Sequence, residues 1–315
     1  MKLSIVATLY QSENYIIEFY QRASENARRL VGNNYEIILV NDGSPDNSLE
    51  LAIPLTETDE HLIVINLSRN FGHHKAMMTG LAQAKGELVF LIDSDLEEEP
   101  EWMLAFSKKM EEEKCDVIYG VQEKRKGGFF ERVSGKLHYD LLRHVMGFPL
   151  PQNITTARLM SKRYVDALLR HNEREMVISG LWYLTGFTQI PFLVKKLQHS
   201  KTTYTFHKKL SLLVNTVISF SNKPLIFIFN IGLIIFSCSS LFVFYLLMNK
   251  LFFSKPISGW TSVMASIWLL GGLIILFIGI IGIYLSKIFL ETKQRPYTII
   301  KSIYHHNSLK ENKIN

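Results

Sequence analysis

The sequence predicts an α/β domain with a doubly wound, mainly parallel sheet, followed by amphipathic interface helices and a two-helix transmembrane hairpin. Short apolar runs alternate with helical patterns through residues 1–205, and each apolar run ends in polar residues. This alternation is typical of parallel strands joined by helices. Of the 315 residues, 47% are hydrophobic, and the apolar surplus is concentrated in residues 225–285. A sheet domain attached to a membrane segment accounts for both observations.

The strand on which the domain is organised is expected at residues 88–92, where five apolar residues run directly into Asp93 and Asp95. An apolar run of this kind, ended by acids and Pro100, predicts a strand buried on both faces of the sheet. Its end lies at the carboxyl edge, where open α/β sheets bind ligands. Two Asp one residue apart point the same way and can reach one cation or one sugar diphosphate. The alternative is a solvated turn leading into a helix near Glu98.

The other expected strands are at residues 3–9, 35–40, 62–67 and 116–121, with helices at 12–30 and 76–84 among them. The second strand ends in Asn41-Asp42-Gly43-Ser44. Gly43 permits a tight turn, and Ser44 or Asp46 can cap the following helix. No Gly-x-Gly-x-x-Gly follows the first strand, which disfavours a dinucleotide-binding oxidoreductase.

Residues 225–248 and 263–285 are each long enough to cross a bilayer core, which needs about 20 residues. The segment at 206–224 is expected to be an amphipathic helix along the lipid surface, because basic residues begin it and an apolar span follows it. A second basic amphipathic helix, at 127–148, either packs on the sheet or lies on the membrane.

The net charge of +6 comes largely from Lys and Arg that flank the apolar blocks, which indicates anionic lipid rather than nucleic acid as the partner. More basic residues lie before the first span and after the second than between them. The sequence therefore predicts a multi-pass protein of the cytoplasmic (inner) membrane, with residues 1–205 and a tail at 287–315 in the cytoplasm. Cys115 and Cys238 are the two cysteines and imply no disulfide framework. The glycines of the second span would let helices approach closely, within the hairpin or between subunits.

A family resemblance rests on motifs spread along almost the whole chain. They are Tyr-Glu-Ile-Ile-Leu-Val-Asn-Asp-Gly-Ser at 35–44, Ser-Arg-Asn-Phe-Gly-His at 68–73, Asp-Ser-Asp-Leu-Glu-Glu at 93–98, Arg-Leu-Met-Ser at 158–161, Gly-Ile-Ile-Gly-Ile-Tyr-Leu at 279–285 and Arg-Pro-Tyr at 295–297. In this order they resemble the family 2 glycosyltransferases of GT-A (Rossmann-like) fold. The subgroup is that of the polyprenyl-phosphate glycosyltransferases, which includes dolichol-phosphate mannose synthase and its two-span bacterial relatives.

The resemblance implies an inverting enzyme that transfers a sugar from a nucleotide-sugar donor to polyprenyl phosphate, undecaprenyl phosphate in a bacterium. The lipid-linked product would be moved across the membrane by a separate flippase and used in cell-envelope glycan modification, and the enzyme would be a homo-oligomer. Two alternatives remain open: transfer to a saccharide or lipid hydroxyl, and a catalytically silent nucleotide-sugar-binding scaffold in the membrane.

The resemblance also implies roles for the strand ends. Asp42 would contact the nucleobase or ribose, with Thr8 and Tyr10 completing the nucleotide pocket. Asp93 and Asp95 would face the ribose and a divalent ion, Mg²⁺ or Mn²⁺, which takes oxygen ligands beside a diphosphate. The ion would neutralise charge on the leaving group.

An anionic acceptor requires cations, and the candidates are Arg125, Lys126, Arg132 and Arg158. Arg158 ranks first because it matches the family motif and can hold a phosphate with two parallel hydrogen bonds. Two further candidates have a structural alternative. Lys75 would contact the diphosphate at a helix start or be simply exposed, and Trp182 would line the sugar or acceptor site or pack in the core.

The chain departs from the family pattern in two places. Asn153 and Thr156 stand where the family has carboxylates before Arg-Leu-Met, and Ser179 stands where it tends to have Arg. The usual general base is therefore missing, although Asp95, Glu97 or Glu98 could serve instead. A phosphate monoester, with a second pKa near about 6, needs no base to become a nucleophile, whereas a hydroxyl does. The departure favours the lipid-phosphate acceptor.

Overall fold

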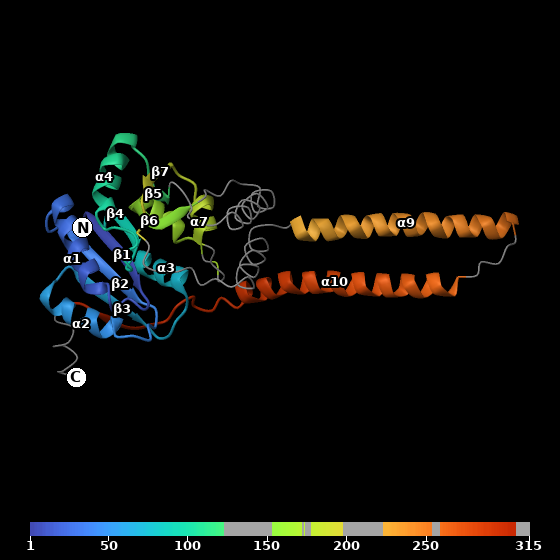
Figure 1. Cartoon of the computed structure of the whole chain (residues 1–315), viewed down its shortest axis with the longest axis horizontal. Coiled ribbons are helices and arrows are strands. Elements are labelled where there is room, and N and C mark those ends of the chain that lie inside the picture. Colours follow the sequence, from blue (N-terminus) through green and yellow to red (C-terminus); the bar gives the residue numbers. More distant parts are fainter. Residues whose placement is uncertain (123–152, 172, 174–177, 198–222, 254–258, 307–315) are drawn as a thin grey trace. The chain divides into compact units, whose positions relative to one another are not determined.

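The computed structural model describes residues 1–122, 153–171, 173, 178–197, 223–253 and 259–306 (Figure 1). These residues fall into two compact units. The first contains the described residues up to 197 together with 295–306, and the second contains 223–253 and 259–294. The amphipathic helices predicted at 127–148 and 206–224 lie outside the described residues.

The first unit is built on an eight-stranded sheet in the order β7-β5-β6-β4-β1-β2-β3-β8 (Figure 1). Its strands are β1 (Leu3–Leu9), β2 (Tyr35–Asn41), β3 (Leu62–Leu67), β4 (Leu88–Asp93), β5 (Val117–Gln122), β6 (Ile154–Ser161), β7 (Gln189–Val194) and β8 (Ile300–Tyr304). The helices are α1 (Ile16–Val31), α2 (Ser48–Thr58), α3 (His73–Gln83), α4 (Trp102–Glu113), α6 (Lys162–Leu168) and α7 (Ile178–Leu184).

The four central strands β4, β1, β2 and β3 are parallel, so their carboxyl ends meet at one edge. The register places Thr8 of β1 beside Asp93 of β4 on one side and beside Val40 of β2 on the other. Antiparallel β6 separates β4 from β5, which makes the sheet mixed. The α/β fold and the expected strand at 88–92 are confirmed.

Helices cover both faces of this sheet, as alternation along the strands requires. In β1, Ile5 belongs to the core beneath α1, α2 and α4, while its neighbour Val6 belongs to the core beneath α3, α6 and α7. All seven residues of β1 and all seven of β2 are buried, which explains why their sequences lack a period of two. The doubly wound arrangement predicted from sequence is therefore present.

Strand β8 is the main departure from the sequence prediction, which treated residues 287–315 as a tail. It pairs antiparallel with β3, and Tyr304 lies opposite Val64. The Ser68 amide also donates a hydrogen bond to the carbonyl of Ile299 (2.9 Å). A five-residue strand whose partner lies far away in the chain leaves no local signal, because the pairing depends on tertiary contact alone.

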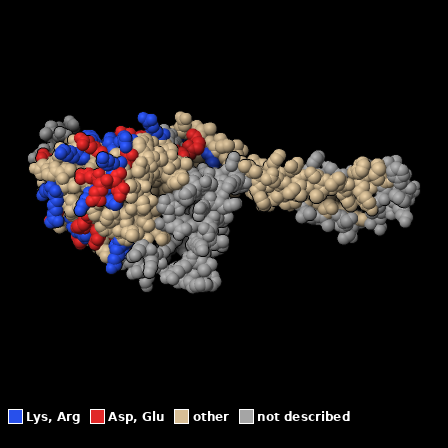
Figure 2. Space-filling model, turned by 90° about the horizontal axis from the view of Figure 1, so that it is seen from above, with Lys and Arg blue, Asp and Glu red and all other residues tan. Residues whose placement is uncertain are grey.

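The second unit consists of α9 (Lys223–Phe253) and α10 (Trp260–Thr292), which contain the two predicted spans. Among the described residues, one stretch is long and apolar enough to cross a membrane, Leu270–Thr292, with a mean hydropathy of 2.5. The apolar stretch Leu225–Ile235 is shorter. In the view of Figure 2, charged side chains cover the sheet domain, and most of the described helical surface carries none. Two membrane crossings stay a prediction.

Helix α3 approaches the sheet closely at Gly80. A Cβ at this position would lie 2.5 Å from Val6 Cγ1 and 3.0 Å from Val40 Cγ2. We expect Gly80→Ala to lower the free energy of unfolding by about 1 kcal/mol or more, because overpacking a filled core outweighs the better helix propensity of Ala. Thermal unfolding of the detergent-solubilised protein measures this, with the exposed Gln83→Ala on the same helix as the control. Equal stability of the two variants would contradict the packing described here.

Candidate active site

The carboxyl ends of β1, β2 and β4 bring together Thr8, Asp42 and Asp93, three residues predicted from sequence to form the site. Thr8 and Asp93 are direct neighbours across the β1–β4 ladder. The Asp42 amide donates to the carbonyl of Leu9 at the end of β1 (3.1 Å). The site therefore rests on rigid strand ends rather than on long loops.

The carboxylate of Asp42 is buried, and both of its oxygens accept backbone hydrogen bonds. Oδ1 accepts from the Phe71 amide (2.7 Å) and Oδ2 from the Gly72 amide (3.0 Å). Burial raises the pKa of Asp42, although these amides act to lower it. Gly43 allows the approach, since it has a φ of +60° and a Cβ there would lie 2.5 Å from the Asn70 nitrogen. Asp42 thus fixes the loop before α3, and its contact with a nucleobase or ribose stays a prediction.

His73, the first residue of α3, links two strand ends through its ring. Nδ1 lies 3.0 Å from Thr8 Oγ1, and Nε2 lies 3.2 Å from Asp93 Oδ1. The His73 side chain is 46% exposed, and its partial burial acts to lower its pKa, but the Asp93 carboxylate outweighs this, so the pKa is raised. Burial acts to raise the pKa of Asp93, and the imidazole outweighs it, so that pKa is lowered. The imidazole and the carboxylate therefore stabilise each other's charged forms.

The acidic loop is residues 93–98, which begin at the last residue of β4 and include the carboxylates of Asp93, Asp95, Glu97 and Glu98. Asp95 is partly exposed, and its Oδ1 accepts a hydrogen bond from the Glu97 amide (3.0 Å). Burial, followed by the charge of Asp93, raises the pKa of Asp95. Ser94 points the other way and donates its hydroxyl proton to the carbonyl of Thr8 (2.7 Å). The charge of Asp93 therefore acts on Asp95, and the binding of one cation by both stays a prediction.

Glu98 is fully buried and ties the acidic loop to β6. Its Oε1 accepts from the Thr156 amide (3.0 Å) and its Oε2 from the Ala157 amide (2.7 Å). Burial and the nearby charge of Asp93 raise the pKa of Glu98 to about 8. Glu98 thus holds the very stretch in which Thr156 replaces the acid of the family pattern. A fully buried carboxyl with both oxygens engaged is a structural anchor rather than an accessible base.

Arg158 lies on β6 opposite Leu91 of β4 and is almost fully buried, with 1% of its surface exposed. Its guanidinium donates to the carbonyl of Thr156 (3.2 Å) and lies over the ring of Trp182. Burial lowers the pKa of Arg158 to about 9. Trp182 is itself 6% exposed and belongs to the core beneath α3, α6 and α7. Trp182 therefore packs in the core, the alternative considered from sequence, and the acceptor role of Arg158 stays a prediction.

The remaining predicted residues differ in their placement. Tyr10 is 48% exposed just after β1, and Lys75 is partly exposed in the first turn of α3. Arg125, Lys126 and Arg132 lie outside the described residues. Their proposed contacts with an anionic acceptor are therefore still predictions.

A divalent ion at this edge would have to be held by Asp93 and Asp95 together with oxygens of a substrate. In the part of the chain that the structure describes, no group of three or more His, Cys, Asp or Glu side chains is arranged to hold a metal. Asp93 Oδ1 is nevertheless buried, and its contact with His73 Nε2 (3.2 Å) lacks the geometry of a good hydrogen bond. Mg²⁺ commonly takes one or two carboxylates and completes its shell with phosphate and water. The residues present fit an ion shared with a diphosphate.

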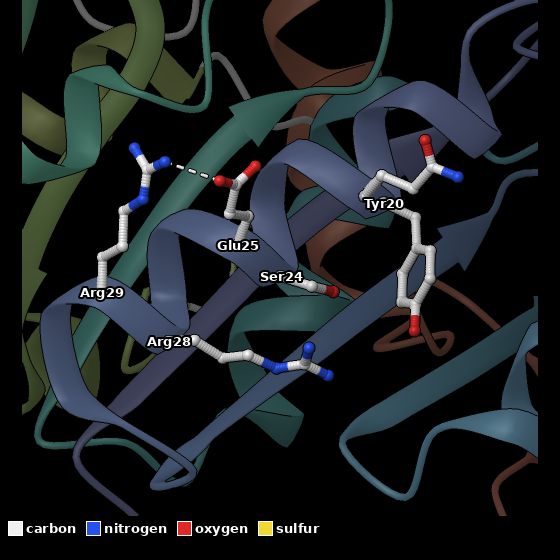
Figure 3. A pocket seen from close by; sticks show the side chains of 6 residues that line it. Tyr20, Ser24, Glu25, Arg28 and Arg29 are labelled. Carbon is white, nitrogen blue, oxygen red and sulfur yellow. Dashed lines mark hydrogen bonds and ion pairs between the residues drawn. The ribbon is translucent and has the colours of Figure 1, made fainter.

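One cavity on the described surface lies elsewhere. It has a volume of about 450 Å³ and is lined by residues of α1, including Tyr20, Ser24 and Arg28 (Figure 3). The Tyr20 hydroxyl donates to Asp59 (2.7 Å), and Arg28 Nε donates to the hydroxyl of Tyr35, which begins β2 (3.1 Å). These partners place the cavity at the amino end of β2, away from the acidic loop. We assign it a structural role.

Two comparisons place the chain among known proteins. The model of glycosyl transferase family 2 matches residues 4–169, more than half of the chain. A relative from Mycobacterium tuberculosis, described as putative glycosyltransferases, is 51% identical over 304 residues, which cover 96% of this chain and 89% of the relative. The chain belongs to glycosyl transferase family 2. The resemblance deduced from the motifs is therefore confirmed, and the mixed α/β sheet is of the GT-A type.

Two further relatives of this family 2 glycosyltransferase match along nearly all of their length. The uncharacterized glycosyltransferase YkcC of Bacillus subtilis is 33% identical, over 96% of this chain and 94% of the relative. The SfII prophage-derived bactoprenol glucosyl transferase of Shigella flexneri is 29% identical, over 98% of this chain and 100% of the relative. Similarity thus extends beyond the sheet domain and through α9 and α10.

Sequence reasoning missed three parts of this site. It considered His73, like Lys75, as a contact with the diphosphate at the helix start or an exposed residue, but it did not predict that the His73 ring would contact Thr8 and Asp93. It considered Glu98 as a base, whereas the structure places it as an anchor. It did not single out Lys196, which contacts the acidic loop from the end of β7. Each of these depends on tertiary contacts that have no local pattern.

The raised pKa of Glu98 predicts a pH-dependent stability. The folded protein keeps the proton up to about pH 8, whereas the same carboxyl in the unfolded chain, with an ordinary pKa of 4.5, has lost it, so wild-type stability falls as pH rises between these values. Glu98→Gln removes this titration. The stability of the variant relative to wild type should therefore rise by about 1 kcal/mol or more from about pH 5.5 to about pH 8.5.

Thermal unfolding of the solubilised protein across this pH range measures the effect. Glu111→Gln, at an exposed position on α4, is the matched control and should show a constant difference from wild type. A constant difference for Glu98→Gln as well would show that burial does not hold the proton on this carboxyl.

Proposed function

We propose that this family 2 glycosyltransferase transfers a sugar, with inversion, from a nucleotide-sugar donor to a polyprenyl phosphate at the cytoplasmic leaflet. Undecaprenyl phosphate is the expected bacterial acceptor. The observation that carries the proposal is similarity over 98% of the chain, apolar helices included, to a protein described as a bactoprenol glucosyl transferase. An acceptor that is a membrane lipid also gives the apolar helices α9 and α10 a purpose.

The donor would bind at the carboxyl edge of β1, β2 and β4. Asp93 and Asp95 would hold Mg²⁺ or Mn²⁺, which when bound neutralises charge on the diphosphate leaving group. The loop that Asp42 fixes lies beside them and would shape the nucleotide pocket together with Thr8 and Tyr10. Support for this comes from Asp93 Oδ1, a buried oxygen whose contact with His73 Nε2 lacks the geometry of a good hydrogen bond.

The reaction balances without removal of a proton. An oxygen of the lipid phosphate forms a bond to the anomeric carbon, the bond from that carbon to the diphosphate breaks, and the nucleoside diphosphate leaves with the electron pair. A phosphate monoester is largely dianionic near neutral pH, since its second pKa is about 6. The acceptor therefore needs no base, which agrees with Thr156 at the family's acidic position and with the burial of Glu98.

The remaining parts of the proposal concern the membrane and the partners. Arg125, Lys126 and Arg132 would contact the anionic headgroup. Arg158 would contact it as well after a local opening of the packing around its side chain. Residues 225–248 and 263–285 would form a two-span hairpin in the cytoplasmic membrane, with 1–205 and 287–315 on the cytoplasmic side. The enzyme would act as a homo-oligomer and pass its product to a flippase for cell-envelope glycan modification.

The direct test is transfer from a panel of radiolabelled nucleotide sugars to undecaprenyl phosphate, by the full chain in detergent, with Mg²⁺, Mn²⁺ or a chelator. We expect an acid-labile lipid-linked sugar from one donor, formed only with metal. Asp95→Asn should lower the rate by at least about a hundredfold, because it removes a charged oxygen from the ion. Asp166→Asn, on the exposed side of α6, is the control and should keep the wild-type rate.

Other outcomes would change the proposal. Donor consumption with a hydroxyl acceptor, but not with lipid phosphate, would make the enzyme a saccharide or lipid hydroxyl transferase. Binding of a nucleotide sugar without any turnover would make it a silent scaffold. Full activity in chelator would remove the metal from the mechanism.

His73 is expected to position Asp93 during this reaction. We predict that His73→Ala lowers turnover by about tenfold to a hundredfold, because residues that orient a metal-binding carboxylate typically contribute that much. His73→Gln, which can still donate to the carboxylate, should recover part of the loss. His74→Ala is the neighbouring control and should stay within about twofold of wild type. Equal losses at both positions would show that the effect comes from the helix start in general.

A further inference from the structure

Lys196, two residues beyond the end of β7, lies against the acidic loop. Its Nζ is 3.1 Å from Glu97 Oε2 and 3.6 Å from Glu98 Oε1. The side chain of Lys196 is 23% exposed, and those of Glu97 and Glu98 are 12% and 1% exposed. Burial acts to lower the pKa of Lys196, but the carboxylates of Glu98, Asp93 and Asp95 outweigh it and raise that pKa. The ammonium group is thus held in the field of the whole acidic loop.

The position of Lys196 is set by the backbone as well as by charge. The amide of the next residue, Leu197, donates to the carbonyl of Glu97 (2.9 Å), so the chain after β7 is fixed to the acidic loop at this point. The preceding residue, Lys195, is exposed. Two adjacent lysines therefore have opposite surroundings, one among carboxylates and one in solvent.

The acidic loop needs such a cation. Buried carboxylates are costly unless a positive charge or several hydrogen bonds compensate them. His73 lies beside Asp93, and the amides of β6 reach Glu98, while Lys196 supplies the positive charge next to Glu97, and next to Glu98 once that carboxyl has lost its proton. The divalent ion of the proposed function would bind to Asp93 and Asp95 of this same loop.

We propose that Lys196 is the resident counter-cation of the acidic loop and that its ammonium group competes with the divalent ion that arrives with the donor diphosphate. This inference rests on the proposed function, because it concerns the same ion. The charges of Asp93 and Asp95 act on Lys196, and like charges repel strongly at a partly buried site. The ion therefore binds most tightly when Nζ has moved off Glu97 and Glu98. Lys196 sets the metal affinity and does not itself react.

The test is equilibrium dialysis of Mn²⁺ against the full chain in detergent, with a nucleoside diphosphate on both sides and no acceptor, and with the protein-bound manganese measured by electron paramagnetic resonance after acid release. Lys196→Met keeps most of the side-chain volume and removes the charge. It should bind Mn²⁺ about tenfold more tightly than wild type, whereas Lys195→Met should be unchanged. Equal or weaker binding in Lys196→Met would overturn the inference.

A second measurement uses the wild-type protein and does not depend on the folding of a variant. Amine-reactive labelling, read by mass spectrometry for each lysine, should increase at Lys196 when Mn²⁺ is added and stay constant at Lys195. Constant labelling at both lysines would mean that the ammonium does not give way to the ion, against the inference.

The two proposals fail in different ways. If no protein binds Mn²⁺, the metal part of the proposed function falls, and the competition falls with it. If Lys196→Met binds Mn²⁺ more tightly but no sugar reaches undecaprenyl phosphate, the competition stands and the proposed acceptor is wrong. If transfer occurs and all affinities are equal, the proposed function stands and the role of Lys196 is rejected.

Discussion

Carboxylates crowded at one edge of a sheet repel each other, and the active edge depends on the donors that keep them there. Each carboxylate is compensated by a different donor. Asp42 accepts two amides of the loop before α3, Asp93 faces the ring of His73, and Glu98 accepts two amides of β6. Lys196, which follows β7 and is far from the acidic loop in the sequence, contributes a positive charge beside Glu97. Because these donors come from the start of α3, from β6 and from the chain after β7, the edge forms only when segments far apart in the sequence have packed together.

These contacts explain why the carboxylates are held rigidly while much of their negative charge is not neutralised. Amides fix a carboxylate in place but carry no net charge, so Asp42 and Glu98 keep raised pKa values despite two hydrogen bonds each. The strand ends remain acidic on the side where Asp93 and Asp95 lie. In the proposed function, this surplus of negative charge is what the divalent ion that arrives with the donor diphosphate would neutralise.

The sequence was sufficient for the features that follow from local patterns. The apolar run before Asp93 predicted a buried strand, and parallel strand ends predicted that Asp42 would lie near it. The orientation of His73 and the burial of Arg158 were not predictable, because both depend on which element packs above the strand. Arg158 sits in a strand whose sequence mixes polar and apolar residues, so its inward side could not be read from alternation.

Strand β8 also bears on how the protein is made. Because synthesis proceeds from the amino terminus, β8 leaves the ribosome only after α9 and α10, and until then β3 is an open edge. Unpaired edges invite pairing with other chains. The sheet of the nascent protein is therefore completed late, only after both apolar helices have left the ribosome.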